Sequence, residues 1–297
     1  MVLKFISFIV LIPILFVCNF QNSNNGKGSV NKALVPETYI GLLDSTINEN
    51  SGLIIWNNHF WTFNDSGGKN EIYGLDLKTG SIRCTVQLSN VRNIDWEDIA
   101  QDKDYIYIGE TGNNFGTRHD QKIYRIRKKE INSKPYQKIN ADSICFNYAD
   151  QTDFKAALRQ TSYDCEALFS FNDSLFIFTK DWLHFKTKVY GFPAKAGNYS
   201  LQPIDSFNVD GLVTGADILP DGRFALIGYK DYHSMAWLFE KKDNKFFSNL
   251  KFIDLGMLEN AQTEGICFSK KEDIFISCEQ TTNYPQQIWK ISKEKLP

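Results

Sequence analysis

The sequence predicts an all-β protein, a β-propeller of five blades. Three observations predict this fold: a short motif that returns five times, strand-like segments that follow every copy, and no helix-like pattern of ten or more residues after the N-terminal segment. Four short strands in units of about 48 residues are typical of propeller blades. The missing helical period argues against a (β/α)8 barrel, in which strands alternate with helices.

The repeated motif joins an acidic or polar residue, a small or acidic residue and an aliphatic residue. Its five copies start 46, 69, 50 and 48 residues apart, at Ser51-Gly52-Leu53, Glu97-Asp98-Ile99, Glu166-Ala167-Leu168, Ala216-Asp217-Ile218 and Glu264-Gly265-Ile266. Each copy opens a hydrophobic segment. We therefore expect every triplet to begin the innermost strand of one blade.

Second and third strands follow each triplet in step. The expected second strands are 59–63, 105–109, 175–179, 224–228 and 273–277. Third strands carry an aromatic ring between hydrophobic residues, and these rings are Tyr73, Tyr124, Tyr190, Trp237 and Trp289. Three landmarks that keep their order five times indicate a structural repeat rather than chance.

Fourth strands are expected in only four units, at 82–88, 142–148, 202–207 and 251–255, because the fifth unit ends at Pro297 without one. The segment 37–44 alternates like a strand and has no other partner. We expect it to complete the last blade, because closing the ring in this way removes exposed sheet edges.

The unit of 69 residues has about 20 residues more than the others. This surplus is either an insertion or a degenerate sixth blade, and an insertion is favoured because no further triplet lies inside it. Within the surplus, the segment 154–160 is expected to form one or two helical turns.

The N-terminal segment predicts export. Lys4 precedes an apolar run of 13 residues, 5–17, which is shorter than the roughly 20 that span a bilayer. Residues 1–18 therefore predict a secretory signal, with an uncleaved membrane anchor as the alternative. The four residues that end at Cys18 resemble a bacterial lipobox, although Val17 stands where a small residue is usual, and the resemblance implies a lipid on Cys18.

Residues 19–33 are polar and rich in Gly, Ser and Asn, as in a flexible tether. This leaves 34–297 as a single propeller domain. We expect a secreted or cell-envelope monomer that touches a membrane only through its lipid anchor.

Charge and cysteine content exclude other classes. The formal net charge of −2 and a pI of about 6.1 leave no basic excess for nucleic-acid binding. Five cysteines follow Cys18, an odd number without C-x-x-C spacing, so neither a disulfide framework nor a zinc site is expected. We expect buried thiols, with Cys267 and Cys278 as the one pair that neighbouring strands bring within reach.

Innermost strands run along the central channel of a propeller, so the first residues of the triplets converge on its axis. The residues expected there are Ser51, Glu97, Glu166 and Glu264. The fourth unit contributes Thr214, Ala216 or Asp217. Clustered carboxylates repel each other in a partly desolvated channel. Either they take up protons, or water and basic side chains balance them, or a cation lies among them. Oxygen ligands in a wide ring favour Ca²⁺ over Mg²⁺.

The loops between second and third strands open at the same end of the channel as the triplets and are unusually polar. The residues that we expect to bind a ligand there are Asp65, Glu110, Asn114, Lys180 and Lys230. The two lysines suit a ligand with a phosphate or carboxylate group. Ordinary turn chemistry is the alternative for each residue taken singly.

Several segments resemble a widespread family of secreted bacterial β-propellers, described as NHL-repeat-like proteins without an assigned activity. The segments that carry the resemblance are 63–67, 93–100 (N-I-D-W-E-D-I-A), 107–114, 164–168, 213–221 and 264–266. The resemblance extends over about residues 34–297 and implies the propeller fold but no reaction.

The order of Ser and Glu in the triplets is also similar to the calcium-dependent apyrases, five-bladed nucleotidases with a central Ca²⁺. The resemblance implies that Ser51, Glu97, Glu166 and Glu264 are calcium ligands. The fourth unit departs from that pattern, because Ala216 has no oxygen in its side chain. The nucleotide-contacting segments of that family have no counterpart in this sequence.

Three hypotheses for the function remain. The first is a calcium-stabilised propeller that binds a small polar or anionic ligand at the channel opening. The second is a metal-dependent hydrolase of phosphate or ester bonds, with Glu97 or Glu110 as the base. The third is a protein-interaction scaffold in which the ion serves stability alone.

Overall fold

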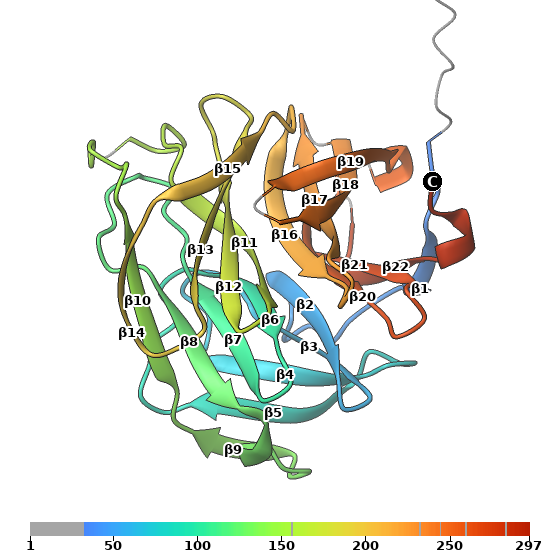
Figure 1. Cartoon of the computed structure of the whole chain (residues 1–297). Helices are drawn as coiled ribbons and strands as arrows, with labels where there is room; N and C mark the ends of the chain where they lie inside the picture. The colour runs from blue at the N-terminus through green and yellow to red at the C-terminus, as the bar shows by residue number, and fades with distance from the viewer. Residues whose placement is uncertain (1–32, 156, 232, 244, 259, 283) are drawn as a thin grey trace, which may run out of the picture. The chain divides into compact units, whose positions relative to one another are not determined.

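The computed structural model describes residues 33–297 except 156, 232, 244, 259 and 283. The predicted signal segment 1–18, its Cys18 and nearly all of the tether lie outside the described residues. The described part of the chain forms five sheets around a central channel, as Figure 1 shows. Each innermost strand contacts the innermost strand of the next blade, and the last contacts the first. This ring confirms the predicted propeller and its five blades.

The blades follow one another along the chain, each with its first strand innermost. The innermost strands are β2 (Asn50–Trp56), β6 (Trp96–Gln101), β11 (Asp164–Phe171), β16 (Leu212–Ile218) and β20 (Thr263–Phe268). The second strands are β3 (His59–Asn64), β7 (Tyr105–Glu110), β12 (Ser174–Lys180), β17 (Arg223–Lys230) and β21 (Ile274–Cys278). All five sheets are antiparallel through these pairs.

Third and fourth strands complete each blade. The third strands are β4 (Glu71–Asp76), β8 (Lys122–Arg127), β13 (Thr187–Pro193), β18 (His233–Lys242) and β22 (Gln287–Ile291). The fourth strands are β5 (Ile82–Leu88), β10 (Asp142–Tyr148), β15 (Pro203–Phe207), β19 (Lys245–Asp254) and, in the last blade, β1 (Glu37–Ile40). Strand β1 pairs antiparallel with β22, with Thr38 opposite Trp289. The predicted closure of the ring by the N-terminal strand is confirmed.

The hydrophobic core consists of five clusters, one between each pair of neighbouring blades. The aromatic residue of every third strand lies in the cluster shared with the preceding blade: Tyr73, Tyr124, Tyr190, Trp237 and Trp289. All five are at most 5% exposed. The repeat is visible in the sequence because each blade must present the same large ring to its neighbour.

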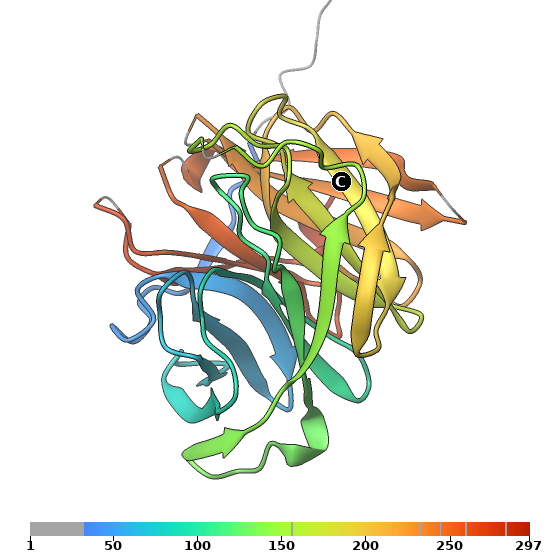
Figure 2. The ribbon, with the colours of Figure 1, turned by 90° about the vertical axis from the view of Figure 1, so that its left-hand side faces the viewer.

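Two strands join the sheet of a neighbouring blade. Strand β9 (Tyr136–Ile139) follows the third strand of the second blade but pairs parallel with β5 of the first blade. Strand β14 (Gly197–Leu201) leaves the third blade and pairs parallel with β10 of the second. Figure 2 shows the molecule from the side on which the green strands of the second blade face the viewer. The sequence analysis did not predict either strand.

The expected helical turns at 154–160 are wrong. Apart from residue 156, which is not described, this stretch is irregular, with a turn at 158–159. Two of its backbone N–H groups bond to the loop after β7: Ala157 N donates to Phe115 O (3.3 Å) and Arg159 N to Asn114 O (2.7 Å). Gln160 N closes a single turn on Ala157 O (3.2 Å). The surplus is therefore an insertion packed on a loop of the second blade and not a sixth blade.

Cys267 and Cys278 do not pair, and all five cysteines of the described residues are free. Cys267 packs in the cluster between the last and first blades, whereas Cys278 packs in the cluster between the fourth and last. The two thiols therefore lie on opposite faces of one sheet, where no disulfide can form. Among the described residues, no helix is long and apolar enough to cross a bilayer.

Candidate metal centre

Every innermost strand has a break in its pairing with the second strand, which falls at the triplet in four blades and at Thr214, before the predicted triplet, in the fourth. The pairing shifts between Ser51 and Ile54, Trp96 and Ile99, Cys165 and Ala167, Val213 and Gly215, and Thr263 and Gly265. An irregularity of this kind leaves residues without a partner and re-aims their side chains. Glu97, Glu166 and Glu264 occupy these breaks and are each only 4% exposed.

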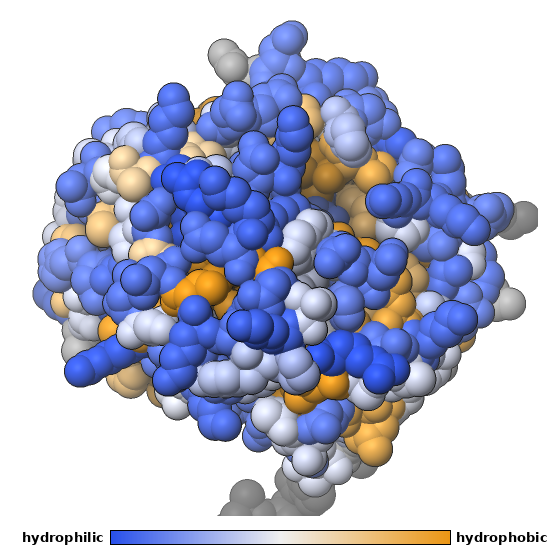
Figure 3. Space-filling model, turned by 90° about the horizontal axis from the view of Figure 1, so that it is seen from below, coloured by the Kyte–Doolittle hydropathy of each residue, from blue (hydrophilic) through white to orange (hydrophobic). Residues whose placement is uncertain are grey.

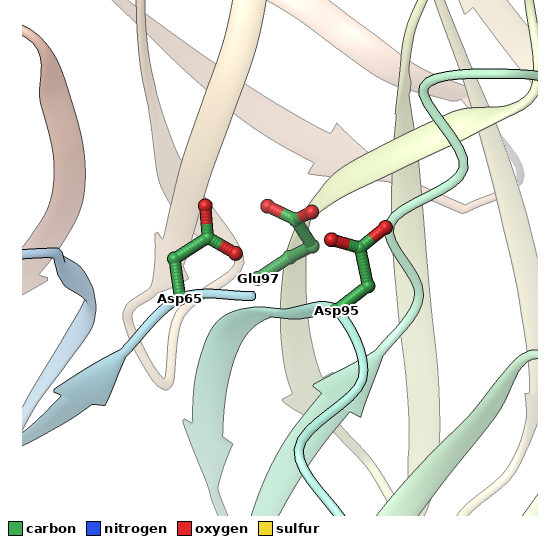
Figure 4. A group of neighbouring side chains, drawn as sticks. All are labelled: Asp65, Asp95 and Glu97. Atoms are coloured by element: carbon green, nitrogen blue, oxygen red, sulfur yellow. The ribbon is translucent and has the colours of Figure 1, made fainter. Parts of the chain in front are cut away.

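Two groups of three carboxylates meet at the channel end where the innermost strands begin, which we call the channel mouth. Asp65, Asp95 and Glu97 each offer one oxygen within 4.8 Å of the others, and Glu97, Asp164 and Glu166 do the same. Figure 4 shows the carboxylates of Asp65, Asp95 and Glu97 turned toward one another. We call these first three residues the acid centre.

Different elements deliver the three side chains. Asp65 follows the second strand of the first blade, Asp95 immediately precedes β6, and Glu97 lies at the start of β6. The loop of Asp95 is fixed because its carbonyl oxygen accepts the N–H groups of Thr111 and Gly112, both at 3.2 Å. The acid centre therefore joins the first two blades at the mouth.

Burial and mutual repulsion raise the pKa values of the acid centre. The pKa of Asp65 rises to about 6, chiefly because of burial. That of Asp95 rises to about 7 through burial and the charges of Asp65 and Asp164. Burial, Asp65 and Glu166 also hold the pKa of Glu97 well above its usual value. The positive charges of Lys180 near Asp65 and of Arg118 near Asp95 do not offset burial and repulsion.

The carboxylates of the second group have more hydrogen-bond and ion-pair partners. Asp164 accepts the N–H of Asn113 at 2.6 Å and the indole N–H of Trp182 at 2.7 Å. Glu166 forms a buried ion pair with Lys180. By contrast, no described residue donates a hydrogen bond to the Glu97 carboxylate, and the nearest cation to Asp95 is Arg118 at 3.9 Å. The acid centre is thus the part of the cluster that a cation would neutralise.

Gly112 leaves room for this arrangement. A Cβ at this position would lie 2.1 Å from Glu97 Oε1 and 2.3 Å from Asp95 Oδ2. Any other residue would displace the two carboxylates, so the site requires glycine. The donor set consists of carboxylate oxygens, which hard divalent cations such as Ca²⁺ and Mg²⁺ prefer. The residues therefore fit a metal ion.

Lys180 balances the other side of the mouth. Its ammonium lies 4.7 Å from the ring centre of Trp182 and 5.1 Å from that of Tyr229. Burial opposes its charge, but Glu166, Tyr229 and Glu264 outweigh burial and raise the pKa of Lys180. Glu264 contacts Gln262 and feels the charges of Lys180, Glu279 and Asp65, and it belongs to neither group of three carboxylates.

Of the four expected metal ligands, two share a group of three carboxylates and two do not. Glu97 and Glu166 lie together, Glu264 lies beside Lys180, and the hydroxyl of Ser51 donates to the carbonyl oxygen of Glu97. In the fourth blade, the Thr214 hydroxyl donates to Thr263 O at 2.6 Å. The two hydroxyl groups thus donate to the backbone of the next blade.

The expected ligand-binding residues do not form one pocket. Asp65 belongs to the acid centre, and Lys180 pairs with Glu166. Glu110 is fully buried, accepts the N–H groups of Ile94 (3.0 Å) and Asp95 (3.1 Å), and pairs with Arg118 at 2.8 Å. Lys230 pairs with Asp210, and the carbonyl of Asn114 holds the insertion.

Two aspartates at the middle position of the triplet join blades: Asp98, which the sequence analysis missed, and Asp217, which it named only as a possible contribution of the fourth unit to the channel axis. Asp98 is fully buried and accepts N–H groups from Ile99 and Leu168 (both 2.8 Å) and from Ala216 (3.2 Å), so one carboxylate joins three blades. Asp217 accepts the N–H of Phe268 in the last blade at 2.8 Å. An acid at a position where other copies have Gly or Ala was the only signal for this role.

A cavity of about 650 Å³ also opens at the mouth, between the third, fourth and last blades. We call it the side pocket. The residues of its lining that matter below are Arg159, Trp182, Phe185, Tyr229, Asn260 and Gln262. Trp182 and Tyr229 connect this pocket with Lys180 and, through Asp164, with the carboxylates of the mouth.

Comparisons with known proteins support the fold class alone. No family model matches the sequence, and no curated protein matches it. Two solved structures of glucose dehydrogenase align with a TM-score of 0.50 over 84% of this chain and 98% of theirs, at 7% and 8% identity. A gluconolactonase from Xanthomonas campestris covers 90% of this chain and 99% of its own, with 13% identity and a TM-score of 0.46. The predicted resemblance to calcium-dependent apyrases stays a prediction.

Proposed function

We propose that this protein is an exported, calcium-binding β-propeller that holds a small polar ligand at the channel mouth. The observation that carries the proposal is the acid centre, in which Glu97 is buried without a hydrogen-bond donor among the described residues. A cation supplies the missing charge, and the three carboxylates are the residues that hold it.

Calcium fits this set better than magnesium. Ca²⁺ takes six to eight oxygen ligands in flexible geometry, whereas Mg²⁺ demands a near-ideal octahedron. Three carboxylates from two loops and one strand give an uneven set and do not fill the coordination of Ca²⁺. The remaining positions are available to water or to oxygen atoms of a ligand.

The test is metal analysis of the purified protein, followed by thermal melting with chelator, Ca²⁺ and Mg²⁺. We expect a bound calcium ion and a higher melting temperature in Ca²⁺ than in chelator. Glu97→Gln should abolish the calcium-dependent shift, and Glu294→Gln, which removes an exposed carboxylate far along the chain, should retain it. A wild-type protein without metal, or with equal melting curves in calcium and chelator, would contradict the proposal.

A metal-dependent hydrolase is the second candidate, because the side pocket opens at the same channel mouth as the proposed ion. Glu110 does not suit the role of base that we considered for it, since two backbone N–H groups and Arg118 already occupy its oxygens. Glu97 remains the candidate. Phosphate esters, nucleotides and lactones turned over by wild type but not by Glu97→Gln would establish hydrolysis.

The scaffold hypothesis finds less support on the surface seen in Figure 3. Hydrophilic residues cover most of that face, and hydrophobic residues show in separate areas between them. Docking surfaces for proteins more often present one continuous apolar patch.

A further inference from the structure

The side pocket has the size and position of a ligand site. Its volume of about 650 Å³ falls within the range of about 300 to 1,000 Å³ that small-molecule sites occupy. None of the residues that line it belongs to the acid centre. It opens among blades three to five, and the acid centre lies between the first two.

One wall of the side pocket is aromatic and held in place. The indole N–H of Trp182 donates to Asp164, and the Lys180 ammonium lies against the rings of Trp182 and Tyr229. Phe185 adds a third ring to the lining. Fixed aromatic faces bind flat apolar surfaces at little cost in conformational entropy.

One cationic side chain, which forms no ion pair with the described residues, lies against this wall. The Arg159 guanidinium lies 4.9 Å from the ring centre of Trp182, and no carboxylate of the described residues lies within ion-pair distance of it. Among the described residues of the lining, Asp231 is the one acid, and no ion pair joins it to Arg159. A stacked guanidinium keeps its N–H edge available for a carboxylate.

The remaining wall offers hydrogen bonds. The side chain of Asn260 supplies an amide donor and acceptor, Gln262 adds the part of its amide that is not bonded to Glu264, and Thr281 and Thr282 also line the pocket. The pocket thus combines an apolar face, several amide and hydroxyl groups, one positive charge on Arg159 and one negative charge on Asp231. A sugar ring with a carboxylate combines the complementary features, because its C–H face is apolar and its edge carries hydroxyls.

We propose that the side pocket binds an acidic sugar, with the pyranose ring on the aromatic wall and the carboxylate on Arg159. The inference deepens the proposed function, since it names the class of ligand at the mouth. It does not require the sugar to touch the ion, because no residue of the side pocket is part of the acid centre.

Calorimetry and tryptophan fluorescence with galacturonate and trigalacturonate test this inference. We expect saturable binding to wild type, and binding at least about tenfold weaker to Arg159→Gln. Arg92→Gln removes the same charge from an exposed position in the loop before β6, outside the lining, and should bind like wild type. Because Arg159 is exposed, its substitution should leave the fold intact.

Galactose and benzoate identify the parts of the ligand that matter. Galactose lacks the carboxylate and benzoate lacks the hydroxyls, so each should bind at least about tenfold more weakly than galacturonate. Benzoate binding as tightly as galacturonate, unchanged binding by Arg159→Gln, or no saturable binding of either uronate would overturn the inference.

The calcium-dependent melting shift of each variant tests the proposed function independently of this inference. Arg159→Gln should keep the calcium-dependent melting shift while it loses the sugar. Glu97→Gln should lose the shift and still bind galacturonate in chelator. A calcium shift without uronate binding rejects the sugar alone, whereas uronate binding without a calcium shift rejects the ion alone.

Discussion

At the scale of single residues, the acid centre depends on the absence of a side chain at Gly112. A methyl group there would lie closer to Glu97 Oε1 and to the Asp95 carboxylate than van der Waals contact allows. The backbone of Gly112 and the two acids therefore define one site together. This makes glycine a more specific probe of the centre than removal of an acid, which also changes its charge.

Gly112→Ala should separate the carboxylates and weaken calcium binding by at least about tenfold, with a loss of stability of about 1 to 3 kcal/mol from overpacking. Calorimetric titration with Ca²⁺ measures the first effect and urea unfolding in chelator the second. Gly41→Ala is the control, because its nearest neighbour is Thr38 Cγ2 at 3.6 Å. Normal calcium affinity in Gly112→Ala would show that the ion lies elsewhere.

Lys128 provides a second prediction at this scale. Its ammonium donates to Gln101 Oε1 at 2.7 Å and to Asp102 O, and burial lowers its pKa from 10.5 to about 8. Between pH 8 and 10.5 the unfolded chain holds a proton that the folded protein has released. The free energy of unfolding contributed by this group therefore rises with pH in that window.

Urea unfolding of wild type and Lys128→Met between pH 7.5 and 10 tests this sign. The difference in free energy of unfolding should grow in favour of wild type by about 1 to 2 kcal/mol, a value reduced for the partial exposure of the group. Lys129→Met, which replaces the exposed neighbour, should remain parallel to wild type. Parallel curves for Lys128→Met would refute the prediction.

The sequence predicted part of the site because equivalent residues of the repeat occupy equivalent positions in successive blades. Glu97 and Glu166 occupy the same place in successive triplets, and the structure brings them together. Asp95 and Asp164 lie two residues before them, outside the triplet, where no pattern distinguishes a ligand from a loop residue. Asp65 was assigned to ligand binding, since a sequence does not show that a loop of one blade reaches the next.

At the scale of elements, the irregular start of each innermost strand has two uses. It turns the glutamates toward the mouth, and it places Asp98 where backbone N–H groups of three blades converge. Strands of neighbouring blades share no ladder of hydrogen bonds at this point. A buried carboxylate therefore supplies bonds that the sheets themselves do not form.

Asp98→Asn should destabilise the protein by about 2 to 3 kcal/mol, because an amide nitrogen replaces an oxygen that accepts backbone N–H groups. Chemical unfolding measures the loss, and hydrogen exchange at Leu168 and Ala216 locates it. Asp173→Asn, in an exposed turn with φ of 58°, is the matched control. Equal stability of Asp98→Asn and wild type would show that this carboxylate does not join the blades.

Strands β9 and β14 are the secondary-structure elements that could not be predicted from the sequence. Both are short and pair parallel with the outer strand of another blade, so neither has the local hairpin pattern that identifies the antiparallel strands. The irregular insertion at 154–160 escaped prediction for a related reason, because the loop that binds its N–H groups is distant in sequence.

At the scale of the whole molecule, the fold was predictable because closure of the ring determines how many strands each repeat unit contributes along the chain. Apart from the additional strands β9 and β14, four units have four strands, the last has three, and one further strand precedes the first. Each interface between blades is then filled by the same kind of aromatic residue. The position of the mouth follows from this order, since all innermost strands begin at one end of the channel.

Closure makes β1 the element on which the last blade depends. The strand covers the edge of β22 and adds Ile40, which is 5% exposed, to the cluster between the last and first blades. A chain that starts at Gly41 should melt about 10 °C below one that starts at Pro36, since several kilocalories of packing and pairing are lost. Both chains lack the N-terminal segment, so the comparison isolates β1. Hydrogen exchange should show protection lost first in β21 and β22 and retained in β7 and β8. Equal melting temperatures, or uniform loss of protection in all blades, would mean that the ring holds without its closing strand.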